Sequence, residues 1–188
     1  MPLRVTLDLT DQDLDHFSHM AIQAQERAHG CPESEVVAAA SELLSSVRES
    51  PASDFIKQRL GQLEELTAML SDAGFAMPED DRQRVVTALA YFNEPDDLIP
   101  DSVPGLGFLD DAIMVELMCR ELRHEIDAYR DFCRFRASEA KRRGVDPESL
   151  GRAEFLENRR LQLISRMRRR RHRDFSSPRG ARSPFSLF

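Results

Sequence analysis

Apolar residues return every three or four positions through most of the chain, which is the pattern of helices that bury one face. Interruptions of this pattern fall at Gly30, Ser50-Pro51, Gly74, a proline-rich stretch after Asn93, and Gly144. They divide the chain into six predicted helices, over about residues 10–29, 32–49, 51–73, 78–93, 110–143 and 147–171. Thr10 followed by Asp13 resembles a capping box, so the first helix is expected to begin there.

Residues 3–9, Leu-Arg-Val-Thr-Leu-Asp-Leu, alternate strictly between apolar and polar side chains. This period of two predicts a β-strand. The chain contains no second segment with the same pattern, and an unpaired strand exposes its hydrogen-bonding edge. We therefore expect residues 3–9 either to pair with the same strand of a second copy, giving a homodimer, or to lie as an extended arm on the helices.

The chain is acidic overall, with a formal net charge of −7, but its basic residues are concentrated at one end. Residues 166–188 contain eight Arg and a single Asp, whereas 32 of the 33 acidic residues lie in the first 165 positions. The candidates for binding an anion are Arg166, Arg168, Arg169, Arg170, Arg171 and Arg173. RNA, a ribosome or an anionic lipid would suit them, and so would the acidic body of the chain itself. From Asp174 onward, a composition rich in Ser, Pro, Arg and Gly predicts a flexible tail.

Residues 94–111 place six carboxylates, three prolines and two glycines between two predicted helices. Pro95 disfavours helical backbone at the preceding residue and so ends the fourth helix. Asp110 and Asp111 stand at the start of the fifth helix, where carboxylates accept hydrogen bonds from free N–H groups. This stretch is therefore predicted to be an elbow that reverses the chain. The alternative is a Mg²⁺ or Ca²⁺ site with the ligands Asp97, Asp101, Asp110 and Asp111, although the sequence lacks the spacing of an EF-hand calcium loop.

The segment 88–115, ALAYFNEPDDLIPDSVPGLGFLDDAIMV, resembles the YkvA-like family of bacterial proteins, which is defined around a domain of unknown function. The positions that match the family pattern are Tyr91, Pro95, Asp97, Leu98, Ile99, Pro100, Asp101, Gly107, Asp110 and Asp111. The resemblance extends over about residues 84–120 and implies a helical hairpin within a core at about 78–143, with no settled activity. Many members look membrane-associated. Glu94 and Asp96 stand where the family usually has Ser and an apolar residue, which weakens a membrane inference here.

Two histidine-containing pairs have spacings that occur in metal sites. Glu121 and His124 share a helix face as in di-iron bundles, but the sequence has no second such pair. His16 and His19 lie one turn apart without a third ligand nearby. Both pairs are predicted to be surface or ion-paired residues. Reduced thiols are predicted for Cys31, Cys119 and Cys133, which are odd in number and far apart.

The sequence thus predicts an all-α bundle of about six helices with a short N-terminal strand. It divides into a strand or arm over residues 1–9, a helical domain over 10–165 and a basic, largely disordered tail over 166–188. No apolar run approaches the roughly 20 residues of a membrane span, and the N-terminus lacks a secretory pattern, so we expect a cytoplasmic protein without a transmembrane segment.

Three functions are compatible with these features. The first is a non-enzymatic helical adaptor that uses its acidic body and basic tail to hold protein partners. The second is a nucleic-acid- or ribosome-associated factor that binds through the arginines of residues 166–188. The third is a divalent-metal-dependent enzyme centred on the acidic elbow. No nucleotide-binding or activated-nucleophile motif is present, so the adaptor, without a catalytic residue or cofactor, is the leading hypothesis.

Overall fold

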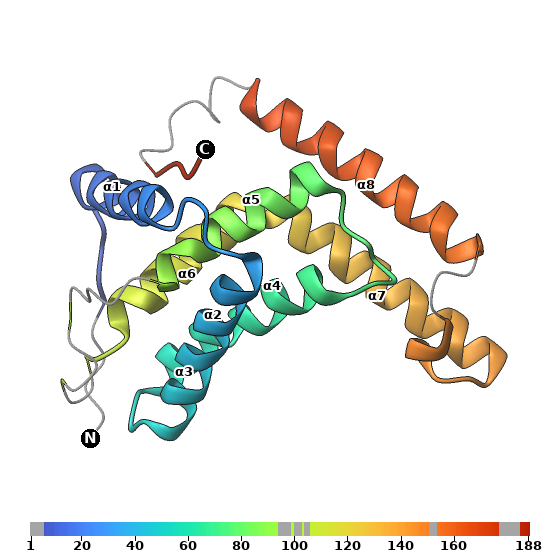
Figure 1. Ribbon diagram of the computed structural model, residues 1–188, viewed down its shortest axis with the longest axis horizontal. Coiled ribbons are helices and arrows are strands. Elements are labelled where there is room, and N and C mark those ends of the chain that lie inside the picture. Colours follow the sequence, from blue (N-terminus) through green and yellow to red (C-terminus); the bar gives the residue numbers. More distant parts are fainter. Residues whose placement is uncertain (1–5, 94–98, 100–102, 104–105, 151–153, 177–184) are drawn as a thin grey trace.

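The computed structural model describes residues 6–93, 99, 103, 106–150, 154–176 and 185–188. These residues form eight α-helical segments and two short 3-10 helices (Figure 1). The α-helices are α1 (Asp11–Arg27), α2 (Glu33–Glu49), α3 (Asp54–Leu60), α4 (Gln62–Ser71), α5 (Glu79–Leu89), α6 (Leu109–Glu121), α7 (Arg123–Arg143) and α8 (Glu154–Phe175). The 3-10 helices are η1 (Ala90–Asn93) and η2 (Pro147–Leu150). The all-helical bundle is confirmed.

Two of the six predicted helices are each divided in the structure. The predicted helix over 51–73 breaks at Gly61 into α3 and α4, and the predicted helix over 110–143 breaks at Leu122 into α6 and α7. Leu122 is fully buried and leaves helical geometry with φ −89° and ψ 13°. The apolar spacing continues through both breaks, and for this reason the sequence pattern did not reveal them.

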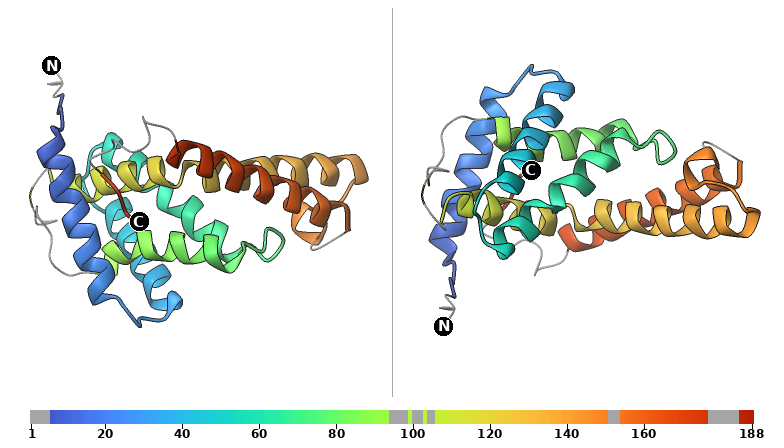
Figure 2. Two further views of the ribbon diagram at one scale, coloured as in Figure 1. Left: turned by 90° about the horizontal axis from the view of Figure 1, so that it is seen from above. Right: turned by 90° about the horizontal axis from the view of Figure 1, so that it is seen from below.

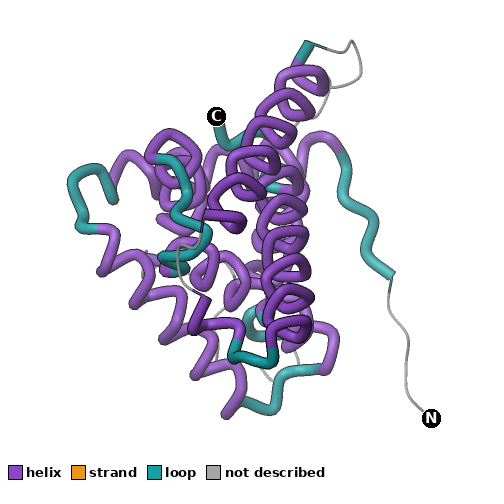
Figure 3. The backbone as a smooth tube through the Cα atoms, turned by 90° about the vertical axis from the view of Figure 1, so that its right-hand side faces the viewer, coloured by secondary structure: helices purple, strands orange, loops and turns teal. Residues whose placement is uncertain are grey.

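The predicted N-terminal strand is not found in the described part of the chain. Residues 6–9 have no regular secondary structure, and Figure 3 shows them leading away from the bundle as a loop. Leu7 is 61% exposed. A strand needs a neighbour to complete its hydrogen bonds, and no described segment of the chain offers one. The capping box of α1 is confirmed, because the Asp13 carboxylate accepts a hydrogen bond from the Thr10 N–H at 2.8 Å and the Thr10 hydroxyl accepts one from the Asp13 N–H.

The prediction of a largely disordered tail over 166–188 is not confirmed either. Helix α8 continues through the arginine-rich run to Phe175, and Phe185 and Leu187 near the C-terminus are each only 3% exposed. The sequence left the acidic body open as one partner of the arginines, and several of them contact carboxylates on the body of the protein.

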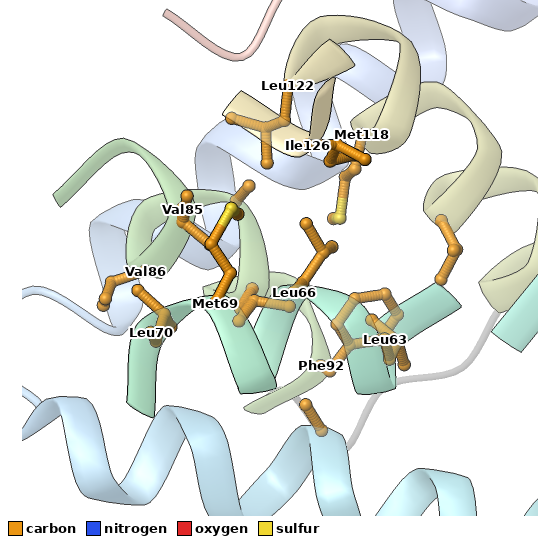
Figure 4. Close-up of a cluster of buried hydrophobic side chains, with 14 of the residues drawn as sticks. Leu63, Leu66, Met69, Leu70, Val85, Val86, Phe92, Met118, Leu122 and Ile126 are labelled. Carbon is orange, nitrogen blue, oxygen red and sulfur yellow. The ribbon is translucent and has the colours of Figure 1, made fainter. Parts of the chain in front are cut away.

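The hydrophobic core is organised around α4. Figure 4 shows Leu63, Leu66, Met69 and Leu70 of α4 beside apolar side chains of α5, η1, α6 and α7. The chain reverses its direction between α5 and α6, and α4 packs against both of these helices. The helices on the two sides of the elbow are therefore joined through the core that α4 provides.

Helices α7 and α8 form a long hairpin that projects from the rest of the bundle (Figure 2). Gly144 ends α7 in the left-handed region, with φ 67°, a conformation that glycine adopts without steric cost. Apolar residues of α8 face α7 and the body, and the buried ones are Leu156, Leu163, Ile164 and Met167. In addition, Arg160 of α8 donates a hydrogen bond to the carbonyl of Ala76 at 2.9 Å. The hairpin is thus an integral part of the fold.

Asp72 links the end of α4 to α7. Its carboxylate accepts hydrogen bonds from the backbone N–H groups of Gly74 at 2.8 Å and Phe75 at 3.1 Å. It also accepts hydrogen bonds from the Tyr129 hydroxyl at 3.2 Å and from Arg136 at 2.9 Å. Burial raises the pKa of Asp72, but the hydrogen bonds from Arg136 and Phe75 outweigh burial, and the pKa lies below its ordinary value.

We expect Asp72→Asn to lower the free energy of unfolding near neutral pH by about 2–4 kcal/mol, because the partly buried Arg136 loses its charged partner. The lowered pKa means that Asp72 stabilises the protein above the unfolded-state pKa and loses this effect as the pH falls through the folded-state pKa. The difference in the free energy of unfolding between the native protein and the variant should therefore shrink below about pH 4. Urea unfolding followed by circular dichroism, from neutral pH to below about pH 4, measures this difference. Asp127→Asn, at an exposed position of α7, is the control and should change stability by less than about 0.5 kcal/mol.

Candidate functional site

The acidic elbow is described only in part. Asp97 and Asp101, together with Pro95, Leu98 and Pro100, lie outside the described residues. Asp110 and Asp111 are buried in the first turn of α6. The Asp110 carboxylate accepts a hydrogen bond from the backbone N–H of Ile99 at 3.1 Å, so this side chain ties the start of α6 to a residue eleven positions earlier.

The backbone just before α6 adopts an uncommon conformation. Phe108 has φ 64° and ψ 12°, in the left-handed region that a bulky side chain rarely enters. Its ring is buried in the core, which holds it in this conformation. Gly107, another position of the family pattern, donates a backbone hydrogen bond to the Val103 carbonyl at 2.9 Å. Tyr91 is buried in η1, with its ring nearly perpendicular to that of Phe92. The described positions of the pattern therefore shape the elbow and its packing.

Within the described part of the chain, no group of three or more His, Cys, Asp or Glu side chains converges in the manner of a metal site. Glu121 and His124 have separate surroundings: burial raises the pKa of Glu121, while the His124 ring contacts Asp174 of α8 at 2.8 Å. His16 and His19 are both exposed on α1, and the His19 ring is hydrogen-bonded to the backbone carbonyl of Asp15 at 2.8 Å. All three cysteines are free thiols.

The inward face of α8 carries arginines that form a buried ion network with the body. Asp81 of α5 and Glu125 of α7 are both fully buried. Arg168 contacts Asp81 at 2.8 Å, and Arg171 lies between the two carboxylates, 2.8 Å from Asp81 and 2.5 Å from Glu125. Arg84 of α5 completes the group, 3.3 Å from Glu125. These five residues are called the ion network.

The ion network makes α8 difficult to remove from the body. Transferring a carboxylate from water into a protein interior costs several kcal/mol unless a cation compensates it. Asp81 and Glu125 are compensated mainly by Arg168 and Arg171, so detaching α8 would leave buried charge without a counterion. Burial alone would lower the pKa of Arg171, but the hydrogen bond and the charge of Glu125 outweigh it and raise that pKa. For Arg84 burial dominates, and its pKa is lowered.

A further contact secures the end of α8. Arg123 and His124, at the start of α7, both bind the carboxylate of Asp174. The hydrogen bonds from Arg123 and His124 lower the pKa of Asp174. The C-terminal turn of α8 is thereby fixed beside the N-terminal turn of α7. The arginine-rich segment is thus held by ion pairs at Arg168 and Arg171 and again at Asp174.

The outward face of α8 presents arginines to solvent. A shallow hollow on this face is lined by Arg166, Arg169, Arg170, His172 and Arg173, which are called the basic face. Arg166 has a long contact of 3.8 Å with Asp131. Within the described residues, Arg169, Arg170 and Arg173 form no ion pair or hydrogen bond through their side chains. The six arginines predicted to bind an anion are therefore divided: Arg168 and Arg171 contact buried carboxylates, Arg169 and Arg173 are exposed, and Arg166 and Arg170 lie on the side of α8 that adjoins Asp127 and Asp131 of α7.

Most other surface arginines are paired with a carboxylate. Arg120 pairs with Glu116, Arg134 with Asp131, and Arg142 with Glu139, each along its own helix. The basic face is thus distinguished by three arginines that form no ion pair within the described residues.

Sequence reasoning did not find Asp81 and Glu125. Asp81 lies in the first turn of α5. The signal that could have revealed it is its position, four residues before Val85 on the buried face of that helix. Glu125 likewise adjoins Ile126 in the apolar stripe of α7. A carboxylate in register with an apolar face is expected to have a buried cationic partner.

The fold and this surface define an all-helical protein with a basic face on its last long helix. Comparison with protein families shows that residues 84–117 are similar to a family described as "Protein of unknown function (DUF1232)". The matched residues extend from Arg84 in α5 through the elbow to Leu117 in α6, which is less than a fifth of the 188-residue chain. No curated protein and no solved structure matches the chain. The basic face lies outside the matched residues.

Across the described residues, none of the helices combines the length and the apolar composition that crossing a membrane requires.

The ion network is tested by comparing Asp81→Asn with Asp80→Asn. The two residues are adjacent in α5, but the Asp81 side chain is 0% exposed and the Asp80 side chain is 91% exposed. We expect Asp81→Asn to lower the free energy of unfolding by about 3–5 kcal/mol, because Arg168 and Arg171 lose a shared carboxylate. Asp80→Asn should change it by less than about 0.5 kcal/mol. Urea denaturation measures both values, and equal effects of the two variants would contradict the role of the network.

Proposed function

We propose that the protein is a non-enzymatic helical interaction module that holds an acidic segment of a protein partner on the basic face of α8. One observation carries this proposal: Arg169, Arg170 and Arg173 are gathered on one side of a helix whose other side is anchored by buried ion pairs. A rigid support reduces the entropy that these side chains lose when a partner binds. Arginine in turn binds carboxylates through two parallel hydrogen bonds.

The size of the basic face favours a short anionic segment over a nucleic acid. From Arg166 to Arg173 the helix advances only about 10 Å, at 1.5 Å per residue. The remainder of the chain is acidic, with 32 of its 33 Asp and Glu residues before position 166. A nucleic acid that extended beyond the basic face would bring its phosphates close to these carboxylates, and binding would be opposed. An acidic peptide can end where the arginines end.

The elbow supports a narrower proposal for the family of the protein. The pattern in residues 88–115 supports membership of the YkvA-like family. The module is further proposed to act in the cytoplasm. In this proposal the motif builds the corner that places α5 and α6 around α4. Arg84 of the ion network lies within the matched residues, so the same segment contributes to the support of α8.

The test is the binding of a fluorescent peptide of about four glutamates, whose extended length of roughly 13 Å matches the basic face, to the full chain at low salt, followed by anisotropy. We expect Arg169→Gln/Arg170→Gln/Arg173→Gln to weaken binding by at least about tenfold, because three charge-assisted contacts are lost. The matched control is Arg120→Gln/Arg134→Gln/Arg142→Gln, which removes the same charge from arginines that already have partners. This control should change the affinity by less than about twofold.

Two outcomes would overturn the proposal. If the native chain does not bind the acidic peptide, the basic face has no such role. If single-stranded RNA of similar charge binds more tightly than the peptide, and the same triple substitution abolishes its binding, the nucleic-acid hypothesis replaces the adaptor.

The homodimer is a separate part of the proposal. Leu7 of the segment over residues 3–9 is exposed, and residues 1–5 lie outside the described residues. If these segments pair between two copies, light scattering should report a dimer for the full chain and a monomer after removal of residues 1–9. A monomer in both forms would exclude pairing through this segment.

A further inference from the structure

The last four residues of the chain pack on the body and bury two of their side chains in the core; the surface of the body that they contact is called the groove. Phe185–Phe188 runs between α1 and α5, apart from the end of α8 (Figure 1). Phe185 and Leu187 are buried with the core, whereas Ser186 and Phe188 are exposed. This alternation is that of an extended peptide that places every second side chain in a groove.

The groove contacts the main chain of this segment. The Ser18 hydroxyl accepts a hydrogen bond from the Ser186 N–H at 3.1 Å, and the Gln25 amide donates one to the Leu187 carbonyl at 3.4 Å. Ser18 and Gln25 lie two turns apart on one face of α1, and Ala21 lies between them on that face. Main-chain hydrogen bonds combined with burial of alternate side chains are the means by which proteins bind extended peptides of varied origin.

The terminal residue adds a contact at the edge of the ion network. The Phe188 ring lies over the Arg84 guanidinium, with its centroid 3.7 Å away. Arg84 also donates a hydrogen bond to Glu125 at 3.3 Å. The groove therefore offers an apolar floor, polar side chains that bind the backbone, and a cation that binds an aromatic ring.

Nine residues, 176–184, separate the end of α8 from this segment. Residues 176–184, Ser-Ser-Pro-Arg-Gly-Ala-Arg-Ser-Pro, contain no large apolar side chain that could anchor them in a core. The groove thus binds a four-residue segment whose anchoring side chains are separated in sequence from those of α8.

We propose that this groove is a binding site for an extended partner peptide with apolar side chains two positions apart, and that the C-terminus of the chain is its intramolecular ligand. The C-terminus belongs to the same chain as the groove, so its effective concentration there is about millimolar, and a partner peptide must displace it to bind. This site differs from the basic face in position and chemistry, and it takes an apolar segment where the basic face takes an acidic one.

Tryptophan fluorescence tests the displacement directly. The chain contains no Trp, so Phe188→Trp in the full chain introduces a single fluorophore that keeps the aromatic contact with Arg84. Adding the peptide Ser-Pro-Phe-Ser-Leu-Phe at millimolar concentration should shift the emission to the red in a saturable manner as the C-terminus is released. A control peptide in which the first Phe and the Leu are replaced by Ser should leave the emission unchanged.

A second variant tests the vacated groove. In the full-length variant Phe185→Ser/Leu187→Ser the C-terminus loses both of its buried side chains and no longer competes for the groove. A fluorescently labelled Ser-Pro-Phe-Ser-Leu-Phe peptide should therefore bind this variant at least about tenfold more tightly than it binds the native chain. The proposal is overturned if the peptide neither shifts the emission nor binds the double variant. It is also overturned if both peptides act alike, or if the emission shift follows protein concentration together with dimer formation, which would make a second copy the occupant. Should the double variant fail to fold by circular dichroism, the fluorescence titration decides alone.

Discussion

The structure depends on the pairing of Asp81 and Glu125, two buried carboxylates of the body, with Arg168 and Arg171 of α8. A buried carboxylate is tolerated only when a cation accompanies it, so these contacts determine where α8 lies. The apolar residues of α8 fix it along α7, and the arginines fix it against α5. Without the network, α8 would lose the contacts that hold it against α5, and the division of its arginines would be lost.

The charge asymmetry of the sequence corresponds to two groups of arginines on α8. One group compensates the buried carboxylates Asp81 and Glu125, and the other forms the basic face. The period of this helix places Arg168 and Arg171 beside buried carboxylates, and Arg169, Arg170 and Arg173 line the basic face. The C-terminal segment reaches the edge of the same network, where Phe188 covers Arg84. The two proposed binding surfaces are therefore connected through one group of buried charges.

Local signals in the sequence were sufficient for most of the helical fold. The capping box at Thr10 and the stop at Gly144 depend on neighbouring residues, and both are found as predicted. The breaks at Gly61 and Leu122 were missed because the apolar period runs through them. The arrangement of α8 could not be predicted from composition, since Arg168 and Asp81 lie 87 positions apart and only the folded chain brings them together. The sequence offered the acidic body as one partner of the arginine run, but it did not identify the carboxylates. Of the elbow residues, Asp110 contacts Ile99, while Asp97 and Asp101 lie outside the described residues.

Native-state hydrogen exchange of α8, resolved by mass spectrometry, tests the central claim most directly. If buried ion pairs hold α8 on the body, the backbone amides of residues 164–175 should be protected near neutral pH and should exchange only through large-scale unfolding, at rates close to those of the α4 core. If these amides exchange as fast as those of an unstructured peptide while α4 remains protected, the arginine-rich segment is a free tail, and the anchoring of α8 by the ion network is contradicted.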